Sequence, residues 1–121
     1  MRQKKLGLGE LEAQIMAALW DDGGWLTPGD VHAVVGKRRR LAYTTVMTVL
    51  ARLHQKGLLE RRRQGRAFAY QPTETREEHA AERMSRLLAE SGDQKLALTC
   101  FVSSMSAAER AQLRRLLKTR R

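Results

Sequence analysis

Two runs of hydrophobic residues near the start of the chain recur at the spacing of a helix. The first run predicts a helix over 9–22, which the Gly23–Gly24 pair is expected to end. A second helix is predicted after Thr27, because threonine is a favourable N-cap and Pro28 suits the first helical position. Gly36 is expected to end this second helix. The apolar positions of the two runs are Leu11, Ile15, Ala18 and Leu19, then Val31, Val34 and Val35.

Over residues 43–56, intrinsic propensity and hydrophobic periodicity predict different secondary structures. Their first half is rich in threonine and valine, which favour strands. The apolar side chains of the segment nevertheless fall at i, i+3, i+4 and i+7, so they share one face of a helix. These residues are Val46, Val49, Leu50 and Leu53. Gly57 follows Lys56 in the position of a helical C-cap. We therefore predict one helix, in which packing overrides propensity.

The opposite face of this predicted helix is polar, and its side chains are short. It carries Thr44, Thr48, Ala51 and Gln55, with Thr45 and Arg52 on one flank. Small hydroxyl and amide groups framed by cations suit close approach to base edges and phosphates. For the helix taken alone, an ordinary exposed face is an equal alternative.

Residues 58–72 predict a β-hairpin, because two extended runs meet at the turn signal Gln64–Gly65. Three arginines lie near its tip, namely Arg62, Arg63 and Arg66. Three helices followed by a basic hairpin are the element order of a winged helix-turn-helix domain. In such a domain we expect the third helix to enter the major groove and the hairpin to lie on the backbone or in the adjacent minor groove.

The net charge of +10 is concentrated over the same region. Residues 37–66 hold ten lysines and arginines against a single acid, Glu60. A uniformly basic segment in a folded domain is typical of a protein that binds a polyanion. A solvated charged surface, a membrane surface and an acidic protein partner stay open as alternatives at this point.

From Thr73 onward the sequence predicts three further helices, which begin at Thr75, Asp93 and Ser106. Because so short a segment cannot build a compact core of its own, we expect these helices to pair with a second copy of the chain rather than fold back. The predicted architecture is mainly α with a small β-hairpin: a winged-helix domain over 1–73 and a dimerisation region over 74–121. The residues expected in the dimer contact are Met84, Leu87, Leu88, Leu98, Phe101, Val102, Leu113, Leu116 and Leu117.

Residues that carry catalytic or metal chemistry are sparse. The three histidines fall on three different predicted helices, and none has a second His or Cys at metal spacing. The single cysteine, Cys100, excludes an intrachain disulfide and fits a reducing cytoplasm. We expect no enzyme, no cofactor and no metal. We also expect a cytoplasmic protein, because neither a membrane span nor a secretory signal is evident.

Two stretches, "LGELEAQIMAALWDDG" and "LAYTTVMTVLARLHQKGLLERRRQGRAFAYQP", resemble the penicillinase-repressor family, the BlaI/MecI group. The similarity covers most of residues 6–72. It implies a homodimeric repressor that binds a palindromic operator on double-stranded DNA, often with TACA/TGTA half-sites, and that controls β-lactamase or related cell-wall stress genes. Carried onto this chain, base reading falls on Tyr43, Thr44, Thr45 and Thr48, and backbone contacts fall on Arg40, Arg52, Arg63 and Arg66.

The resemblance also implies a release step. Some family members leave DNA when a membrane sensor-protease pathway triggers cutting of the dimerisation region. The matching position here is Cys100–Phe101, but the family pattern has asparagine before the phenylalanine. A plain dimer-core role for Phe101 is therefore the favoured alternative. Copper sensing is not expected, because the Cys-x-Cys tail of the copper-responsive branch is missing from the sequence.

Two other classes of function stay open. A winged helix can bind an acidic protein partner, and this hypothesis predicts only weak, non-specific binding of duplex DNA. RNA binding is less favoured, because the six aromatic residues do not predict a stacking sheet.

Overall fold

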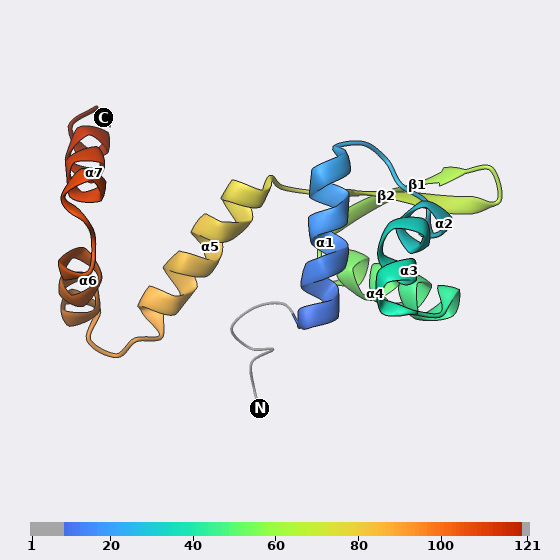
Figure 1. The fold of residues 1–121 in the computed structure, drawn as a ribbon, viewed down its shortest axis with the longest axis horizontal. Coiled ribbons are helices and arrows are strands. Elements are labelled where there is room, and N and C mark those ends of the chain that lie inside the picture. Colours follow the sequence, from blue (N-terminus) through green and yellow to red (C-terminus); the bar gives the residue numbers. More distant parts are fainter. Residues whose placement is uncertain (1–8, 120–121) are drawn as a thin grey trace. The chain divides into compact units, whose positions relative to one another are not determined.

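The computed structural model describes residues 9–119, which fall into two compact units. Unit 1 ends at Arg83 and unit 2 begins at Met84. Figure 1 shows the element order, with the hairpin of unit 1 projecting beyond the helices of that unit. The sequence predicts a domain boundary between residues 73 and 74. The division between the two structural units falls within helix α5 (Arg76–Ala89).

The first helix and its boundaries are as predicted. Helix α1 (Glu10–Asp22) ends at Gly23, whose φ of 80° is a left-handed conformation that suits glycine. Helix α2 (Pro28–Val31) begins at a reciprocal capping box. The Asp30 N–H donates to the Thr27 hydroxyl over 3.2 Å, and the Thr27 N–H donates to the Asp30 carboxylate over 3.0 Å.

The prediction that the second helix stops at Gly36 is wrong. The chain continues as a π-helical turn, η2 (His32–Gly36), and as α3 (Lys37–Arg39), before Arg40 leaves the helix at a φ of 56°. Gly36 serves packing instead, because a Cβ there would lie 2.3 Å from His32 Cδ2. The missing side chain therefore leaves room for the imidazole ring.

The threonine-rich stretch is one helix, as periodicity predicted. Helix α4 (Tyr43–Gln55) buries Val46, Val49, Leu50 and Leu53 almost completely. These side chains join a single core cluster with residues of α1, of α2–η2 and of the hairpin, namely Ile15, Met16, Leu19, Val31, Val35, Leu59 and Tyr70. Burial of a complete apolar face compensates for the low helix propensity of threonine and valine.

The hairpin also forms as predicted. Strands β1 (Leu59–Gln64) and β2 (Ala67–Pro72) pair antiparallel, with Arg61 opposite Tyr70 and Arg63 opposite Phe68. Two hydrogen bonds tie β2 to the loop after α1: the Leu26 N–H donates to the Tyr70 carbonyl over 3.0 Å, and the Tyr70 N–H donates to the Leu26 carbonyl over 2.7 Å. The wing is therefore tied through β2 to the loop that follows α1.

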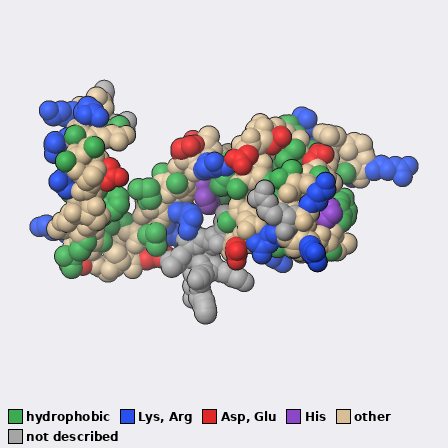
Figure 2. Space-filling model, in the orientation of Figure 1, with side chains coloured by type: hydrophobic (Ala, Val, Ile, Leu, Met, Phe, Trp, Pro, Cys, Tyr) green, Lys and Arg blue, Asp and Glu red, His purple; other side chains and the backbone are tan. Residues whose placement is uncertain are grey.

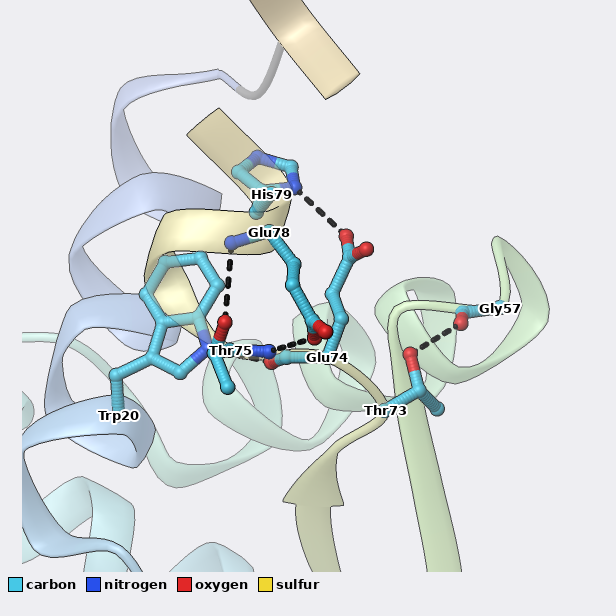
Figure 3. Close-up of polar contacts among 7 residues, drawn as sticks. All are labelled: Trp20, Gly57, Thr73, Glu74, Thr75, Glu78 and His79. Carbon is cyan, nitrogen blue, oxygen red and sulfur yellow. Dashed lines mark hydrogen bonds and ion pairs between the residues drawn. The ribbon is translucent and has the colours of Figure 1, made fainter. Parts of the chain in front are cut away.

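The first turn of α5 is fixed to α1 within unit 1. The Trp20 indole N–H donates to the Glu74 carbonyl over 3.0 Å, and the Trp20 ring lies 5.4 Å from the His79 ring, centroid to centroid. Figure 3 shows these residues around the capping box of Thr75, with His79 Nδ1 lying 3.2 Å from a carboxylate oxygen of Glu74. These contacts explain why the structural division lies beyond Thr73.

Unit 2 contains the rest of α5, then α6 (Gln94–Ser103) and α7 (Ala107–Thr119). The predicted caps are present, because the Asp93 side chain accepts from the Leu96 N–H and the Ser106 hydroxyl accepts from the Glu109 N–H. Among the described residues of α5, α6 and α7, none is buried.

Candidate nucleic-acid interface

Helix α4 turns short hydroxyl side chains to the outside of unit 1. Thr44 and Thr48 are exposed, and Thr45 is half-buried. Arg52 is exposed beside them. Met47, which sequence reasoning did not single out, is 44% exposed on the same helix. The outward surface of α4 therefore combines hydroxyl, methyl and thioether groups with one cation, and it holds no acid.

The hydroxyl hydrogen of Thr48 is already used in a hydrogen bond within α4. Its hydroxyl donates to the Thr44 carbonyl over 2.9 Å. A threonine hydroxyl has one hydrogen to donate and two lone pairs to accept with. In this conformation, Thr48 therefore offers a ligand its lone pairs and its methyl group. These groups match an exocyclic amine and a thymine methyl in the major groove.

Tyr43 begins α4 and is held by the preceding helical turn. Its ring lies 6.0 Å from the His32 ring, centroid to centroid, at an interplanar angle of 82°. His32 Nε2 in turn lies 2.8 Å from the Leu41 carbonyl oxygen. Tyr43 remains 43% exposed, so it is positioned without being buried. The N-cap residue Ala42 gives the first turn of α4 no side-chain acceptor.

The arginines of the wing lie on two faces of the hairpin. The Arg61 and Arg63 guanidinium carbons lie 4.1 and 5.0 Å from the centroid of the Phe68 ring. The Arg62 guanidinium carbon lies 4.4 Å from the centroid of the Trp25 ring. Each such cation–π contact contributes about 0.5–1 kcal/mol at an exposed site. Arg66 is exposed in the turn after Gly65, and Figure 2 shows basic side chains at the projecting end of the hairpin.

Part of the basic segment is neutralised by α1. The Lys56 ammonium donates to both carboxylate oxygens of Glu12 over 3.0 Å, and Arg39 lies 3.5 Å from Glu10. Burial raises the pKa of the Glu12 carboxyl, but the hydrogen bonds from Lys56 and Gly9 and the charges of Lys56 and Arg52 outweigh it, so the pKa is lowered overall. Lys56 therefore has a structural role, whereas Arg40 is exposed at the end of α3.

The nine residues predicted to form the dimer contact all lie in unit 2. Six are exposed, among them Phe101 at 52% and Leu117 at 68%, and three are half-buried: Leu88, Val102 and Leu113. Phe101, Leu113 and Leu116 come together with Met105 in an open groove of about 410 Å³ between α6 and α7. Cys100 is exposed on α6 beside Phe101. Figure 2 shows green hydrophobic side chains on the surface of these helices.

Residues 9–119 contain neither a metal-binding cluster nor a membrane-spanning helix. Within this range, no cluster of three or more His, Cys, Asp or Glu side chains is placed to hold a metal ion. Within the same range, every helix is too short or too polar to cross a membrane.

Unit 1 contains three helical segments, namely α1, the continuous run α2–η2–α3, and α4, followed by a hairpin wing. With α4 facing outward, these elements define a winged-helix domain. The solution structure of the DNA-binding domain of the repressor BlaI supports this fold, with a TM-score of 0.52 and 26% identity. The structural match covers 57% of this chain and 83% of that domain. A MepR variant from Staphylococcus aureus bound to an oligodeoxyribonucleotide has a TM-score of 0.52 at 20% identity, which shows the fold alone; the match covers 95% of this chain and 78% of that one.

Sequence comparison gives the family. The penicillinase repressor family model matches residues 8–119. The transcriptional regulator BlaI of Mycobacterium tuberculosis, from strains CDC 1551 / Oshkosh and ATCC 25618 / H37Rv, is 43% identical over 113 residues. That match covers 91% of this chain and 82% of the relative. The chain belongs to the penicillinase repressor family and is a transcriptional regulator of the BlaI type.

Proposed function

We propose that this chain is a homodimeric repressor that reads a palindromic operator with α4 and contacts the DNA backbone with its wing. The proposal rests chiefly on the exposed hydroxyl surface of α4, from Tyr43 to Thr48, together with the exposed arginines of the wing. Short side chains bring the helix backbone close to the groove floor, and the arginines provide phosphate contacts. The predicted backbone contacts are Arg40, Arg52, Arg63 and Arg66, all of which are exposed.

The exposed apolar residues of unit 2 support the dimer. Helices with no buried side chain cannot be held by their own packing, and an apolar surface of this kind marks a protein interface. A twofold dimer would present two α4 helices to two half-sites, which is how such proteins read palindromes. By analogy with the family, the regulated genes are those for a β-lactamase or a related cell-wall stress response.

The base-reading role of α4 is tested with a double variant, Thr44→Ala plus Thr48→Ala. We measure affinity by fluorescence anisotropy for a duplex carrying inverted TACA/TGTA halves and for a scrambled duplex of the same composition. Loss of two base contacts, each worth about 1–3 kcal/mol, should reduce the preference for the operator at least about tenfold per half-site.

Thr119→Ala is the matched control, because it removes an exposed helical threonine outside unit 1. It should leave the preference unchanged. Full selectivity in the Thr44→Ala plus Thr48→Ala protein would show that α4 does not read the bases.

A further inference from the structure

Successive side chains of β1 point to opposite faces of the hairpin, so the three consecutive arginines of the wing do not all lie on one face. Arg61 and Arg63 point to the face that carries Phe68 and Tyr70, because directly paired residues of an antiparallel hairpin share a face. Arg62 lies on the other face, opposite Ala69. Ala69 is fully buried there, and the Arg62 guanidinium lies over Trp25. One arginine of the three thus covers the base of the wing, and two share an aromatic ring.

Arg61 and Arg63 both place their guanidinium groups against the Phe68 ring. Both guanidinium groups lie within about 5 Å of the Phe68 centroid, where the negative face of the ring attracts them. Across the part of the chain that the structure describes, no carboxylate forms an ion pair with Arg61 or Arg63. Glu60 is the one acid of the hairpin, and strand alternation places it on the opposite face.

Two preoriented guanidinium groups without an acidic partner have free N–H donors with which to bind an anion. A guanidinium binds a phosphate through paired N–H donors, and binding is stronger when the side chains are ordered beforehand. Phe68 is partly buried against the core, so the ring is fixed and can act as the platform for both side chains.

We propose that Phe68 is a positioning residue that holds Arg61 and Arg63 as a pair for the phosphodiester backbone of duplex DNA. The inference rests on the proposed function and adds to it, because Arg61 and Phe68 were not among the residues expected to contribute to DNA contacts. Arg62 has no part in this site, since it packs on Trp25 on the opposite face.

The first test compares Arg61→Gln, Arg63→Gln and Arg62→Gln, which remove the same charge from adjacent positions of one strand. Affinity for the TACA/TGTA duplex is measured at several salt concentrations. Each of the first two variants loses one phosphate contact per subunit of the proposed dimer, so the slope of log affinity against log salt should flatten by about 1.8, which is about 0.9 for each contact. Arg62→Gln should change the slope by less than half of that.

The second test separates positioning from folding by a double-mutant cycle. Phe68→Leu should weaken binding about threefold to tenfold in the wild-type background, because the ring contacts to two guanidinium groups are lost. In the Arg61→Gln plus Arg63→Gln background, Phe68→Leu should have no further effect. Phe68→Tyr keeps the ring and should bind like the wild type. A merely structural role would weaken binding equally in both backgrounds.

Equal losses in both backgrounds, or equal slopes for Arg61→Gln and Arg62→Gln, would overturn the inference while leaving operator reading by α4 intact. If the wild-type chain shows no preference for the TACA/TGTA duplex over the scrambled duplex but the cycle behaves as described, the proposed operator fails and the phosphate site stands. If the wild-type chain does not bind either duplex, both proposals fall.

Discussion

At the scale of single residues, one close contact sets the start of α4, the helix proposed to read DNA. Gly36 gives space to the His32 ring, and that ring contacts both the Leu41 carbonyl and Tyr43. The π-helical turn that brings these groups together is of a kind often found at functional sites. Glycine at this position is therefore required by packing in a helix rather than by a turn.

Gly36→Ala should lower the free energy of unfolding by about 1–3 kcal/mol, because the added methyl group collides with His32 and overpacks the turn. Urea denaturation followed by circular dichroism measures the change. Gly29→Ala is the matched control, since the nearest side-chain atom to its added Cβ would be 3.8 Å away. An unchanged stability of Gly36→Ala, or an equal loss in a His32→Ala background, would contradict this explanation.

The sequence could predict some of these residues and not others. The exposure of Thr44 and Thr48 follows from the helical position of the apolar residues, so pattern alone was sufficient. The contact of His32 with Tyr43 depends on a π-helical turn, which the spacing of apolar residues does not predict. Arg61 could not be separated from Arg62 until the register of the hairpin was known.

At the scale of elements, α1 and α4 are joined by a bidentate ion pair. Glu12 is almost fully buried, and Lys56 reaches it from the end of α4. The pKa of the Glu12 carboxyl is lowered in the folded chain, so the pair stabilises the fold above the ordinary glutamate pKa. This stabilisation is lost as the pH falls through the lowered pKa.

Lys56→Ala should cost about 1–3 kcal/mol of folding free energy at neutral pH, because it leaves a buried carboxylate without its main partner. The pKa of Glu12 should then rise, since burial is no longer outweighed. The stability gap to the wild type should therefore narrow as the pH falls from the raised Glu12 pKa of the variant to the lowered pKa of the wild type, a range that includes the ordinary glutamate value of about 4.3. Denaturation curves at several pH values test this, and a pH-independent gap would contradict it.

Helix boundaries were predictable where a capping side chain or a terminal glycine marked them in the sequence. Thr27, Asp93 and Ser106 each cap a helix as their side chains suggested, and Gly23 ends α1. The predicted end of the second helix is wrong, because glycine at position 36 makes room for the His32 ring four residues earlier and does not end the helix. A glycine signal is ambiguous whenever close packing and chain reversal both favour glycine.

At the scale of the whole molecule, unit 2 is the part proposed to join two copies of the chain. Its helices have exposed leucines and a phenylalanine and no buried residue within the described range. The sequence identified these apolar positions. The boundary between residues 73 and 74 stays a prediction; the structural division at Arg83 reflects contacts between Trp20 and the first turn of α5.

Phe101→Glu plus Leu117→Glu should convert a dimer into monomers, because charges would replace two exposed apolar side chains of the proposed contact. Sedimentation equilibrium measures the mass. Val34→Glu is the control: Val34 is 56% exposed in unit 1, and the same change there should leave the dimer intact. A dimer that survives the double substitution would place the contact elsewhere.

We propose above all that a dimer of this chain reads a palindrome through α4. Footprinting of the DNA upstream of its own gene with the purified full chain tests this proposal. We expect one protected region with two inverted TACA/TGTA-like halves, and its centres should be an integral number of helical turns apart. Diffuse, salt-labile protection without inverted halves would contradict the claim, because it would mean that the basic face binds duplex DNA without reading it.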